Sequence, residues 1–486
     1  MQDLKGRTIR AGIINVGARG VGFVVRILSI MILGRLLDPT DYGLVTMVTA
    51  FTGVLNMLGA FGLLQAAIQR DSLSEEESTV LFWLNVAFGG LLTLIAIVAA
   101  PAVSRFYHEP RLIAIMEVVG IMFIITGAGI QHGVLLQRRM LFGVSAAIEI
   151  AALLIGAVVA VGMAMAGYGY WALVSMTVTL PLATTIGLWI ATGWTPGRPQ
   201  MVPGVRSMLR FGFGTTLNGF VTYFANNIDK LLLGRVWGTE ALGLYGRAFH
   251  LINFPGDNLN ATIGEVAFAA LSRTKDDLDR FRRYFLKAYS LVVTLTVPVT
   301  VVCALFADDL IVVILGPKWA AAAEIFRILA PTILVFAISN PLGWLLNSLG
   351  LIKRGAYIAL LSAPLLVGAV VAGIPYGARG VAAAYSIMMV VKVIPTVVWA
   401  LHGTGVRARE IFAALSRPLA ASAAAAVAGF AVHSLCGPEL SPVLRLALDL
   451  GAFGAVYVAT LVLLAGQQAL HLYLDLFRAA KTVPSV

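Results

Sequence analysis

The sequence predicts an all-α, polytopic membrane protein with about 14 transmembrane helices. Of its 486 residues, 59% are hydrophobic and only 12% are charged, and the mean hydropathy is +0.89. A soluble domain carries about 25% charged residues, so a chain this apolar needs lipid around it. Apolar runs of about 20 residues, the length that crosses a bilayer as a helix, recur along the whole sequence.

Each predicted span is an apolar segment bounded by a short polar break. The segments fall at residues 11–37, 42–66, 79–104, 112–136, 143–166, 169–192, 209–236, 241–270, 285–307, 324–350, 356–375, 380–401, 415–436 and 443–466. No break between them is long enough to fold as a separate domain.

The basic residues predict how the chain is oriented. The net charge is +11; in a soluble protein it would suggest nucleic acid, but here the lysines and arginines lie mostly in short loops, so no nucleic-acid partner is expected. If the N-terminus is cytoplasmic and the spans alternate, about 22 basic residues lie on the cytoplasmic side and about 8 on the other. This bias predicts a multi-pass inner-membrane protein with both termini in the cytoplasm. The first apolar run contains two arginines and no cleavage site, so we interpret it as an uncleaved helix rather than a signal peptide.

The sequence lacks the common motifs for catalysis and cofactor binding. The sequence has no P-loop, no His-Glu-x-x-His and no G-x-S-x-G, and its two cysteines predict neither a metal site nor a disulfide. The chain is therefore expected not to be an enzyme and to need no cofactor. A coupling ion, Na⁺ or H⁺, stays unassigned, because charged residues lie in or near several spans and the sequence does not rank them. These residues are Glu117, Glu149, Glu265 and Lys392.

The sequence also repeats itself. Leu33–Arg35 recurs as Leu233–Arg235, and Gly43 with the leucine after it recurs at Gly243, all at an offset of 200 residues. Farther along, the five residues from Gly156 recur from residue 368 at nearly the same offset. The shared order of these matches indicates a duplicated unit of about six helices.

The repeat predicts the domain organisation. We expect an N-terminal six-helix bundle at residues 1–195, a second bundle at 196–405, and two additional helices with a cytoplasmic tail at 406–486. Because the repeat unit has an even number of helices, both copies enter the membrane from the same side, and a binding site is expected between them. The polar linker at residues 195–206, with three prolines, is expected to connect the bundles flexibly.

Several junctions between predicted helices resemble those of a known family. They are Leu33–Leu44, Gly167–Leu173, Leu315–Trp319 and Arg327–Ala330. Together with the two six-helix halves, they resemble the Wzx-type polysaccharide exporters of the multidrug/oligosaccharidyl-lipid/polysaccharide (MOP) superfamily. The resemblance implies two bundles around a central cavity. It also implies a flippase for undecaprenyl-pyrophosphate-linked oligosaccharide, directed from the cytoplasmic to the periplasmic leaflet, with a polymerase and other polysaccharide assembly proteins as partners.

Polar residues of the first span form one candidate binding face. Asn15, Arg19, Gly22, Arg26 and Ser29 follow one another by steps of four and three, so they share a helix face. Charged residues within a span are costly and default to functional hypotheses, and a guanidinium matches the geometry of phosphate oxygens. We expect the two arginines to line the cavity and meet the pyrophosphate. The alternatives are that Arg19 extends toward the cytoplasmic interface of the membrane, or that each arginine pairs with a carboxylate inside the protein.

The seventh and eighth spans supply the other candidates. The repeat places the seventh span opposite the first, where Asp229 is the expected partner of Arg26, or else forms a structural ion pair with Lys230. On the eighth span Arg247 is a third candidate for the anionic headgroup, and His250 binds sugar or a proton unless it is structural. The complete set of substrate-binding candidates is Arg19, Arg26, Asn226, Asn227, Asp229, Lys230, Arg247 and His250.

Three other functions stay open at this point. A flippase for the peptidoglycan precursor shares the fold and the charge logic, and the sequence barely separates it. A drug/cation antiporter of the same superfamily would favour carboxylates in its cavity, whereas arginines dominate the faces described above. A membrane polymerase or ligase would need a large external loop, and the predicted external loops are short.

Overall fold

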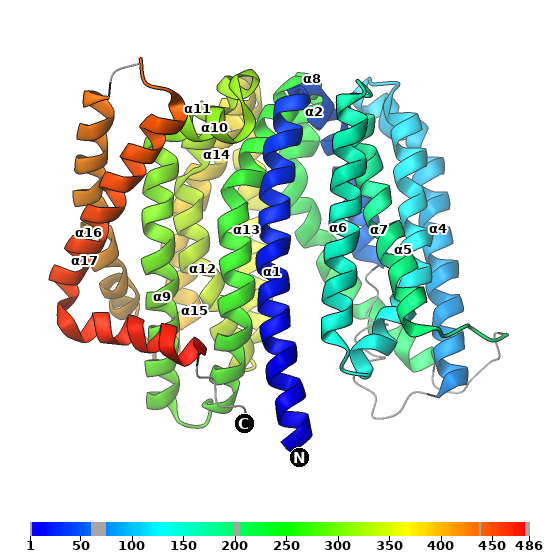
Figure 1. Cartoon of the computed structure of the whole chain (residues 1–486), viewed down its shortest axis with the longest axis horizontal. Helices are drawn as coiled ribbons and strands as arrows, with labels where there is room; N and C mark the ends of the chain where they lie inside the picture. The colour runs from blue at the N-terminus through cyan, green and yellow to red at the C-terminus, as the bar shows by residue number, and fades with distance from the viewer. Residues whose placement is uncertain (1, 60–73, 199–204, 437–438, 482–486) are drawn as a thin grey trace. The chain divides into compact units, whose positions relative to one another are not determined.

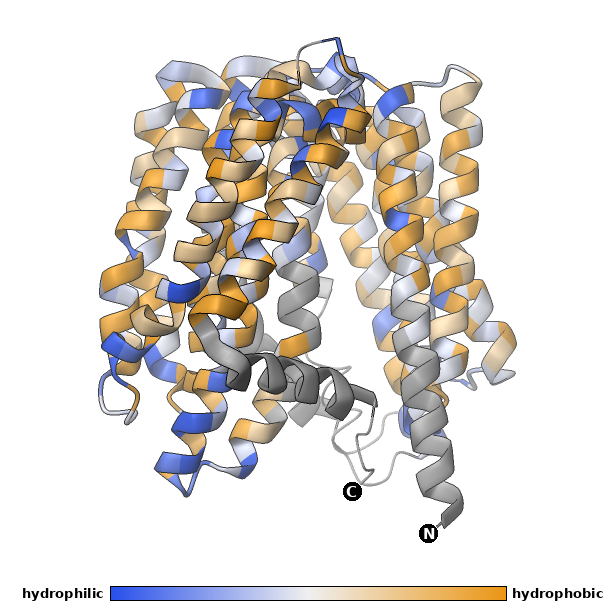
Figure 2. Ribbon diagram, turned by 60° about the vertical axis from the view of Figure 1, so that its left-hand side comes forward, coloured by the Kyte–Doolittle hydropathy of each residue, from blue (hydrophilic) through white to orange (hydrophobic). Residues whose placement is uncertain are grey.

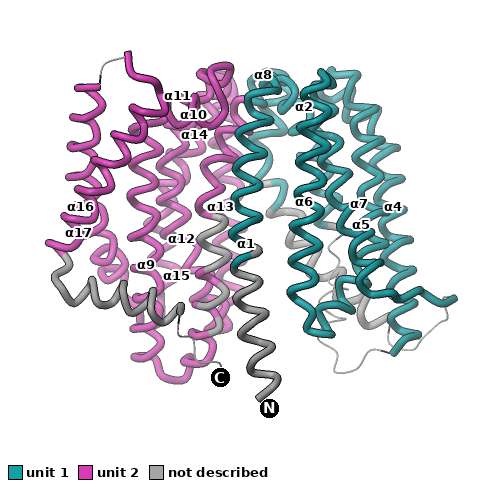
Figure 3. The backbone as a smooth tube through the Cα atoms, viewed as in Figure 1, with its two compact units in different colours: residues 1–243, 485–486 teal, residues 244–484 magenta. Residues whose placement is uncertain are grey.

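The computed structural model describes residues 2–59, 74–198, 205–436 and 439–481, and every regular element in these ranges is a helix (Figure 1). The predicted all-α class is therefore confirmed. The chain folds into two compact units, Met1–Gly243 and Leu244–Pro484 (Figure 3). Apolar residues make up much of the described helices, as the colours of Figure 2 show, and many large apolar side chains are exposed, which suits a lipid environment.

The described residues of the first unit form six helices and the first part of a seventh. They are α1 (Gln2–Leu36), α2 (Pro39–Gly59), α4 (Glu75–Tyr107), α5 (Leu112–Arg138), α6 (Phe142–Met165), α7 (Trp171–Thr192) and the start of α8 (Val205–Arg273). α4 begins with a capping box: the Ser74 hydroxyl accepts from the Glu77 amide at 3.0 Å, and the Glu77 carboxylate accepts from the Ser74 amide at 3.1 Å.

Glycines bring α4 and α5 into close contact. A Cβ built on Gly89 would lie 2.5 Å from the carbonyl oxygen of Phe123, and one on Gly127 would lie 2.5 Å from that of Asn85. Small residues thus let the two backbones approach each other, as is common in membranes. By contrast, a Cβ on Gly17, Gly20 or Gly22 of α1 would meet no atom within 4 Å.

The second unit continues α8 and adds the remaining helices. They are α9 (Leu278–Leu305), α10 (Ala307–Leu315), the 3₁₀ helix Pro317–Trp319, α11 (Ala320–Leu329), α12 (Pro331–Ser348), α13 (Ile352–Gly373), the 3₁₀ helix Ile374–Tyr376, α14 (Gly377–Val391), α15 (Val393–Leu401), α16 (Ala408–Leu435) and α17 (Pro442–Lys481). The Trp319 side chain is fully buried in the core of this unit.

The number of spans stays a prediction. In the described ranges, each predicted apolar segment falls on helix. Eight helices there are long and apolar enough to cross a membrane, or nine if the pair Pro317–Leu329 and Pro331–Ser348, bent by 46°, counts as one span. The count is lower than predicted partly because Ile352–Leu401, which takes in two predicted spans, counts once. The two predicted spans in α8, which continues through a kink at Gly238 (φ 79°), are not among the eight.

The start of the predicted linker contacts α4. The indole N–H of Trp83 on α4 donates to the carbonyl oxygen of Gly197 at 2.9 Å. The ring of Phe82 packs edge-to-face against Trp194 at 6.0 Å. The segment around residues 194–197 therefore packs against α4. Residues 199–204 lie outside the described part of the chain, and a flexible connection stays a prediction. The bundle boundaries at residues 195 and 405 remain predictions.

A reporter fused after Val486 tests the predicted orientation. An even number of spans and the basic N-terminus require a cytoplasmic C-terminus, so a reporter that works only in the cytoplasm should be active there. The same reporter fused within residues 108–111, a predicted external loop, should be inactive. Activity of a periplasm-specific reporter at Val486 would contradict the even count.

Candidate functional site

Arg26 stands unpaired on the exposed side of α1. Its side chain is exposed and makes no hydrogen bond or ion pair with any described residue. One turn earlier, a Cβ on Gly22 would meet open space, whereas Ser29 is buried and its hydroxyl donates to the Val25 carbonyl at 2.7 Å. The backbone of Arg19 belongs to α1, but its side chain lies outside the described residues. In the described part of the predicted stripe, Arg26 is therefore an exposed cation without a described partner.

The polar residues of the predicted seventh span lie together on α8. Asn226 is exposed, and Asp229 is 1% exposed. The Lys230 ammonium donates to the side-chain oxygen of Asn227 at 2.8 Å, and the Asn227 amide donates to the Tyr223 carbonyl at 3.0 Å. The Asn227 side chain thus keeps the Lys230 ammonium close to α8. The side chain of Asn226 is accessible to a ligand.

Tyr223 fastens this part of α8 to α2. Its hydroxyl lies 3.2 Å from the carbonyl oxygens of both Thr49 and Ala50. A Cβ on Gly53 would overlap this hydroxyl, so the approach depends on a glycine at that position. Since Tyr223 lies just before the polar residues of α8, the contact positions their helix face relative to α2.

A second contact between α2 and α8 is made twice, by equivalent positions of the two sequence repeats. A Cβ on Gly43 would overlap the carbonyl oxygen of Thr239, and a Cβ on Gly243 would overlap that of Pro39. Positions 43 and 243 are equivalent in the repeat, as are 39 and 239. Each copy therefore makes the same contact on the other, which is the pattern of a two-fold interface. The two copies of the repeat inferred from sequence therefore contact each other at these glycines.

The last two candidates, Arg247 and His250, lie on α8 in the second unit. Arg247 is half-buried, and His250 is exposed with its ring 6.3 Å from that of Phe254. They share a helix face with Asn253, as their spacing predicted. A common ligand for these residues and Arg26 remains a prediction.

Three of the four charged residues considered for ion coupling lie within the described side chains. Glu117 and Glu149 are exposed and Lys392 is half-buried, and none of the three makes a hydrogen bond or ion pair with a described residue. The side chain of Glu265 lies outside the described residues. An ion-coupling role for any of the four therefore stays a prediction.

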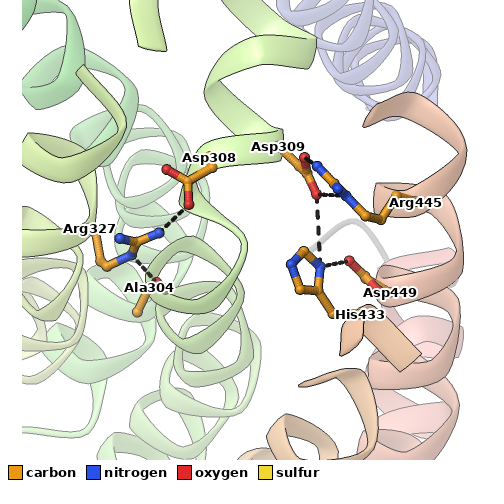
Figure 4. A network of polar contacts seen from close by, with 7 residues as sticks. All are labelled: Ala304, Asp308, Asp309, Arg327, His433, Arg445 and Asp449. Atoms are coloured by element: carbon orange, nitrogen blue, oxygen red, sulfur yellow. Dashed lines mark hydrogen bonds and ion pairs between the residues drawn. The ribbon is translucent and has the colours of Figure 1, made fainter. Parts of the chain in front are cut away.

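Sequence reasoning missed a charged network in the second unit. Asp309 on α10, His433 on α16, and Arg445 and Asp449 on α17 lie side by side (Figure 4). The signal was present, because Asp449 is a charged residue inside the apolar segment 443–466. Its partners could not be found from spacing, since Asp309 and Arg445 are far apart in the chain.

Outside the membrane-spanning helices, an ion pair closes the turn between α4 and α5. The Arg111 guanidinium donates to the Glu109 carboxylate at 2.8 and 2.9 Å. These hydrogen bonds hold the pKa of Glu109 below its usual value. The pair is too exposed to contribute much to stability, and it orders a predicted external loop rather than forming a binding site.

Comparison with known proteins identifies similar sequences. A family model described as polysaccharide biosynthesis protein matches residues 32–324. The teichuronic acid biosynthesis protein TuaB of Bacillus subtilis (strain 168) is 28% identical over 332 residues, 67% of this chain and 68% of that protein. The lipopolysaccharide biosynthesis protein WzxC of Escherichia coli (strain K12) is 25% identical over 77% of this chain and 76% of that protein. The succinoglycan biosynthesis transport protein ExoT of Rhizobium meliloti (strain 1021) is 23% identical over 94% and 93%.

Two solved structures share the fold. One is the lipid II flippase MurJ in an inward closed conformation, with a TM-score of 0.73 and 11% identity over 93% of this chain and 98% of that chain. The other is an inward-facing multidrug resistance MATE transporter of the MOP superfamily, with a TM-score of 0.61 and 15% identity over 83% and 99%. At these identities the likeness shows the fold alone, which is that of the MOP-superfamily transporters.

Proposed function

Because this chain belongs to the polysaccharide biosynthesis protein family, we propose that it moves a lipid-linked oligosaccharide from the cytoplasmic to the periplasmic leaflet of the inner membrane. It is a multi-pass membrane protein with a MOP-type transporter fold. The names of its relatives refer to three different polysaccharides. The proposed cargo is therefore an undecaprenyl-pyrophosphate-linked repeat unit for exopolysaccharide, capsule or O-antigen synthesis.

The main support for this proposal is Arg26, which is exposed and has no partner among the described residues. A guanidinium within a membrane span is costly when nothing compensates it. An anionic headgroup would compensate it, and a pyrophosphate can take its two parallel N–H groups at once. The attraction is stronger in a partly dry cavity than in water because the local dielectric is lower.

The other candidate residues have complementary roles in the proposal. Arg19 and Arg247 add positive charge for the two phosphates. Asn226 and His250, both exposed, offer hydrogen-bonding groups for sugar hydroxyls. Asn227 orients Lys230, and the buried Asp229 offsets part of the positive charge of the site.

The repeat supports alternating access as the mechanism. Proteins built from two such copies transport by rocking one against the other around a central site. The reciprocal contact of Gly43 and Gly243 lies at the predicted external ends of the first, second, seventh and eighth spans. In the proposal it is made when the site is closed to the periplasm and separates when the cargo leaves.

Loss of the protein tests the proposed cargo. In cells without it, the lipid-linked repeat unit should accumulate in the cytoplasmic leaflet, protected from a glycan-modifying enzyme added outside spheroplasts. Restoring the wild-type chain should make the repeat unit accessible again. No accumulation, together with loss of resistance to cationic drugs, would instead support an antiporter.

The MurJ-like fold makes the peptidoglycan precursor the second candidate cargo. Expression of this chain in cells depleted of their lipid II flippase discriminates between the two. The proposal expects no rescue of growth at a level of protein that fully restores polysaccharide export. Rescue of growth without export would reverse the assignment.

A further inference from the structure

The two helices outside the repeat carry charged residues in apolar surroundings. On α17, Asp449 is fully buried, and Arg445 lies one turn before it. Near the end of α16 is His433, whose side chain is 35% exposed. The N-terminal turn of α10 contributes Asp309, which is 3% exposed. None of these residues belongs to the candidate substrate-binding set.

Their side chains form one connected network (Figure 4). Both carboxylate oxygens of Asp309 accept from Arg445, with the Nε donating at 2.7 Å and Nη2 making the second bond. The Nδ1 atom of His433 lies 2.8 Å from Oδ2 of Asp449 and 3.9 Å from Oδ2 of Asp309. The other carboxylate oxygen of Asp449 is buried without a hydrogen-bond partner among the described residues.

The charges of the network balance only with one added cation. Two carboxylates and one guanidinium leave a net charge of −1 when the imidazole of His433 is neutral. An uncompensated charge in a buried network is strongly unfavourable. A single proton on His433 makes the network neutral, and it places an imidazolium N–H against Asp449.

A metal ion fits this arrangement less well than a proton. Ligand atoms of Asp309, His433 and Asp449 do lie within 4.8 Å of one another. However, both oxygens of Asp309 are already occupied by the guanidinium of Arg445, and a bound metal would be repelled by that cation. We propose that His433 and Asp449 form a proton-binding site, completed by Asp309 and Arg445, that holds α16 and α17 on the N-terminus of α10 while the proton is bound.

Among the described residues, two further carboxylates lie on the segments that adjoin the end of α16 that carries His433. Asp308 on α10 also acts electrostatically on Arg445 but pairs with Arg327. Glu439 is exposed in the segment between α16 and α17.

The facing group from the end of α9 is the ring of Phe306, 5.8 Å from the imidazole. The ion pair of Arg282 with Glu410 joins the opposite ends of α9 and α16, about 35 Å away along the helix at 1.5 Å per residue. α15 (Val393–Leu401) has no titratable residue.

The site connects to the rest of the second unit through α10. Asp308, beside Asp309, pairs with Arg327 on α11, and the Nε of Arg327 donates to the Ala304 carbonyl near the end of α9 at 3.2 Å. Neighbouring aspartates thus join α10 to α9 and α11 on one side and to α16 and α17 on the other. Loss of the proton would weaken only the second connection. Use of this proton to drive transport would rest on the proposed function, whereas proton binding itself does not.

Histidine-selective ¹⁵N NMR on the full-length protein in detergent tests the site. The chain has six histidines, and His433→Gln assigns the signal. At one fixed pH near neutrality, Asp449→Asn should lower the ratio of imidazolium to neutral imidazole at His433 about tenfold or more, because the adjacent anion is removed. Arg445→Gln should raise the ratio, since Asp309 is then free to face the imidazole.

Ser434→Ala is the matched control. Its hydroxyl donates to the Ala431 carbonyl on its own helix, so the ratio at His433 should not change. Arg445→Gln decides the question if Asp449→Asn does not fold. An unchanged ratio in both variants would overturn the proposal. So would a stoichiometric metal in the purified protein that is absent from His433→Gln. Neither result depends on transport, so failure here is distinct from failure of the proposed function.

Discussion

Arg26→Ala is expected to abolish polysaccharide export while the amount of folded protein in the membrane stays near normal. Arg26 is exposed and has no partner among the described residues, so its removal breaks no internal contact. Loss of a charge-assisted hydrogen bond to a ligand costs about 1.5–3 kcal/mol, which is roughly ten- to hundredfold in binding. Export in a complementation assay, divided by membrane protein level, measures the effect.

Variants at and away from Arg26 separate binding from folding. Arg26→Lys should restore export only in part, because it keeps the charge and loses the fork of parallel N–H groups. Arg139→Ala, an exposed arginine at the end of α5, should export normally. If Arg26 instead forms a structural ion pair, Arg26→Ala would lower the folded protein and Asp229→Asn would restore it. Full export by Arg26→Ala at normal abundance would remove Arg26 from the site.

The second large effect is expected at the reciprocal glycine contact. Gly43→Ala and Gly243→Ala should each reduce export strongly and to a similar extent. The added methyl group would overlap a backbone carbonyl, of Thr239 in one case and Pro39 in the other, and no side-chain rotation relieves such a clash. Overpacking of this kind costs about 1–3 kcal/mol, enough to depopulate the closed contact by roughly five- to hundredfold.

Gly20→Ala is the control for this prediction. Gly20 is also in a helix, but a Cβ there would meet no atom within 4 Å, and alanine is the better helix former. Its export should equal that of wild type. If Gly43→Ala and Gly243→Ala differ widely, or if both export normally, then the contact is not part of the transport cycle.

The sequence by itself determined the features that depend on local pattern. Hydropathy identifies helices because every buried backbone group in lipid must be bonded within its own segment. Residue identities at a constant offset predicted the two copies of the repeat, and the structure brings Gly43 and Gly243 together. Helical spacing also placed Arg26 on a polar face, where the structure leaves it exposed.

Only the tertiary structure decided which residues far apart in the chain become partners. An aspartate in an apolar helix must be compensated, but hydropathy and spacing do not say by which cation. Packing of α10 against α17 pairs Asp309 with Arg445, and packing of α16 against α17 adds His433 to Asp449. The docked start of the linker has the same origin, because it depends on Trp83 reaching Gly197. A periodic pattern describes one helix at a time, whereas these contacts depend on the three-dimensional packing of several helices.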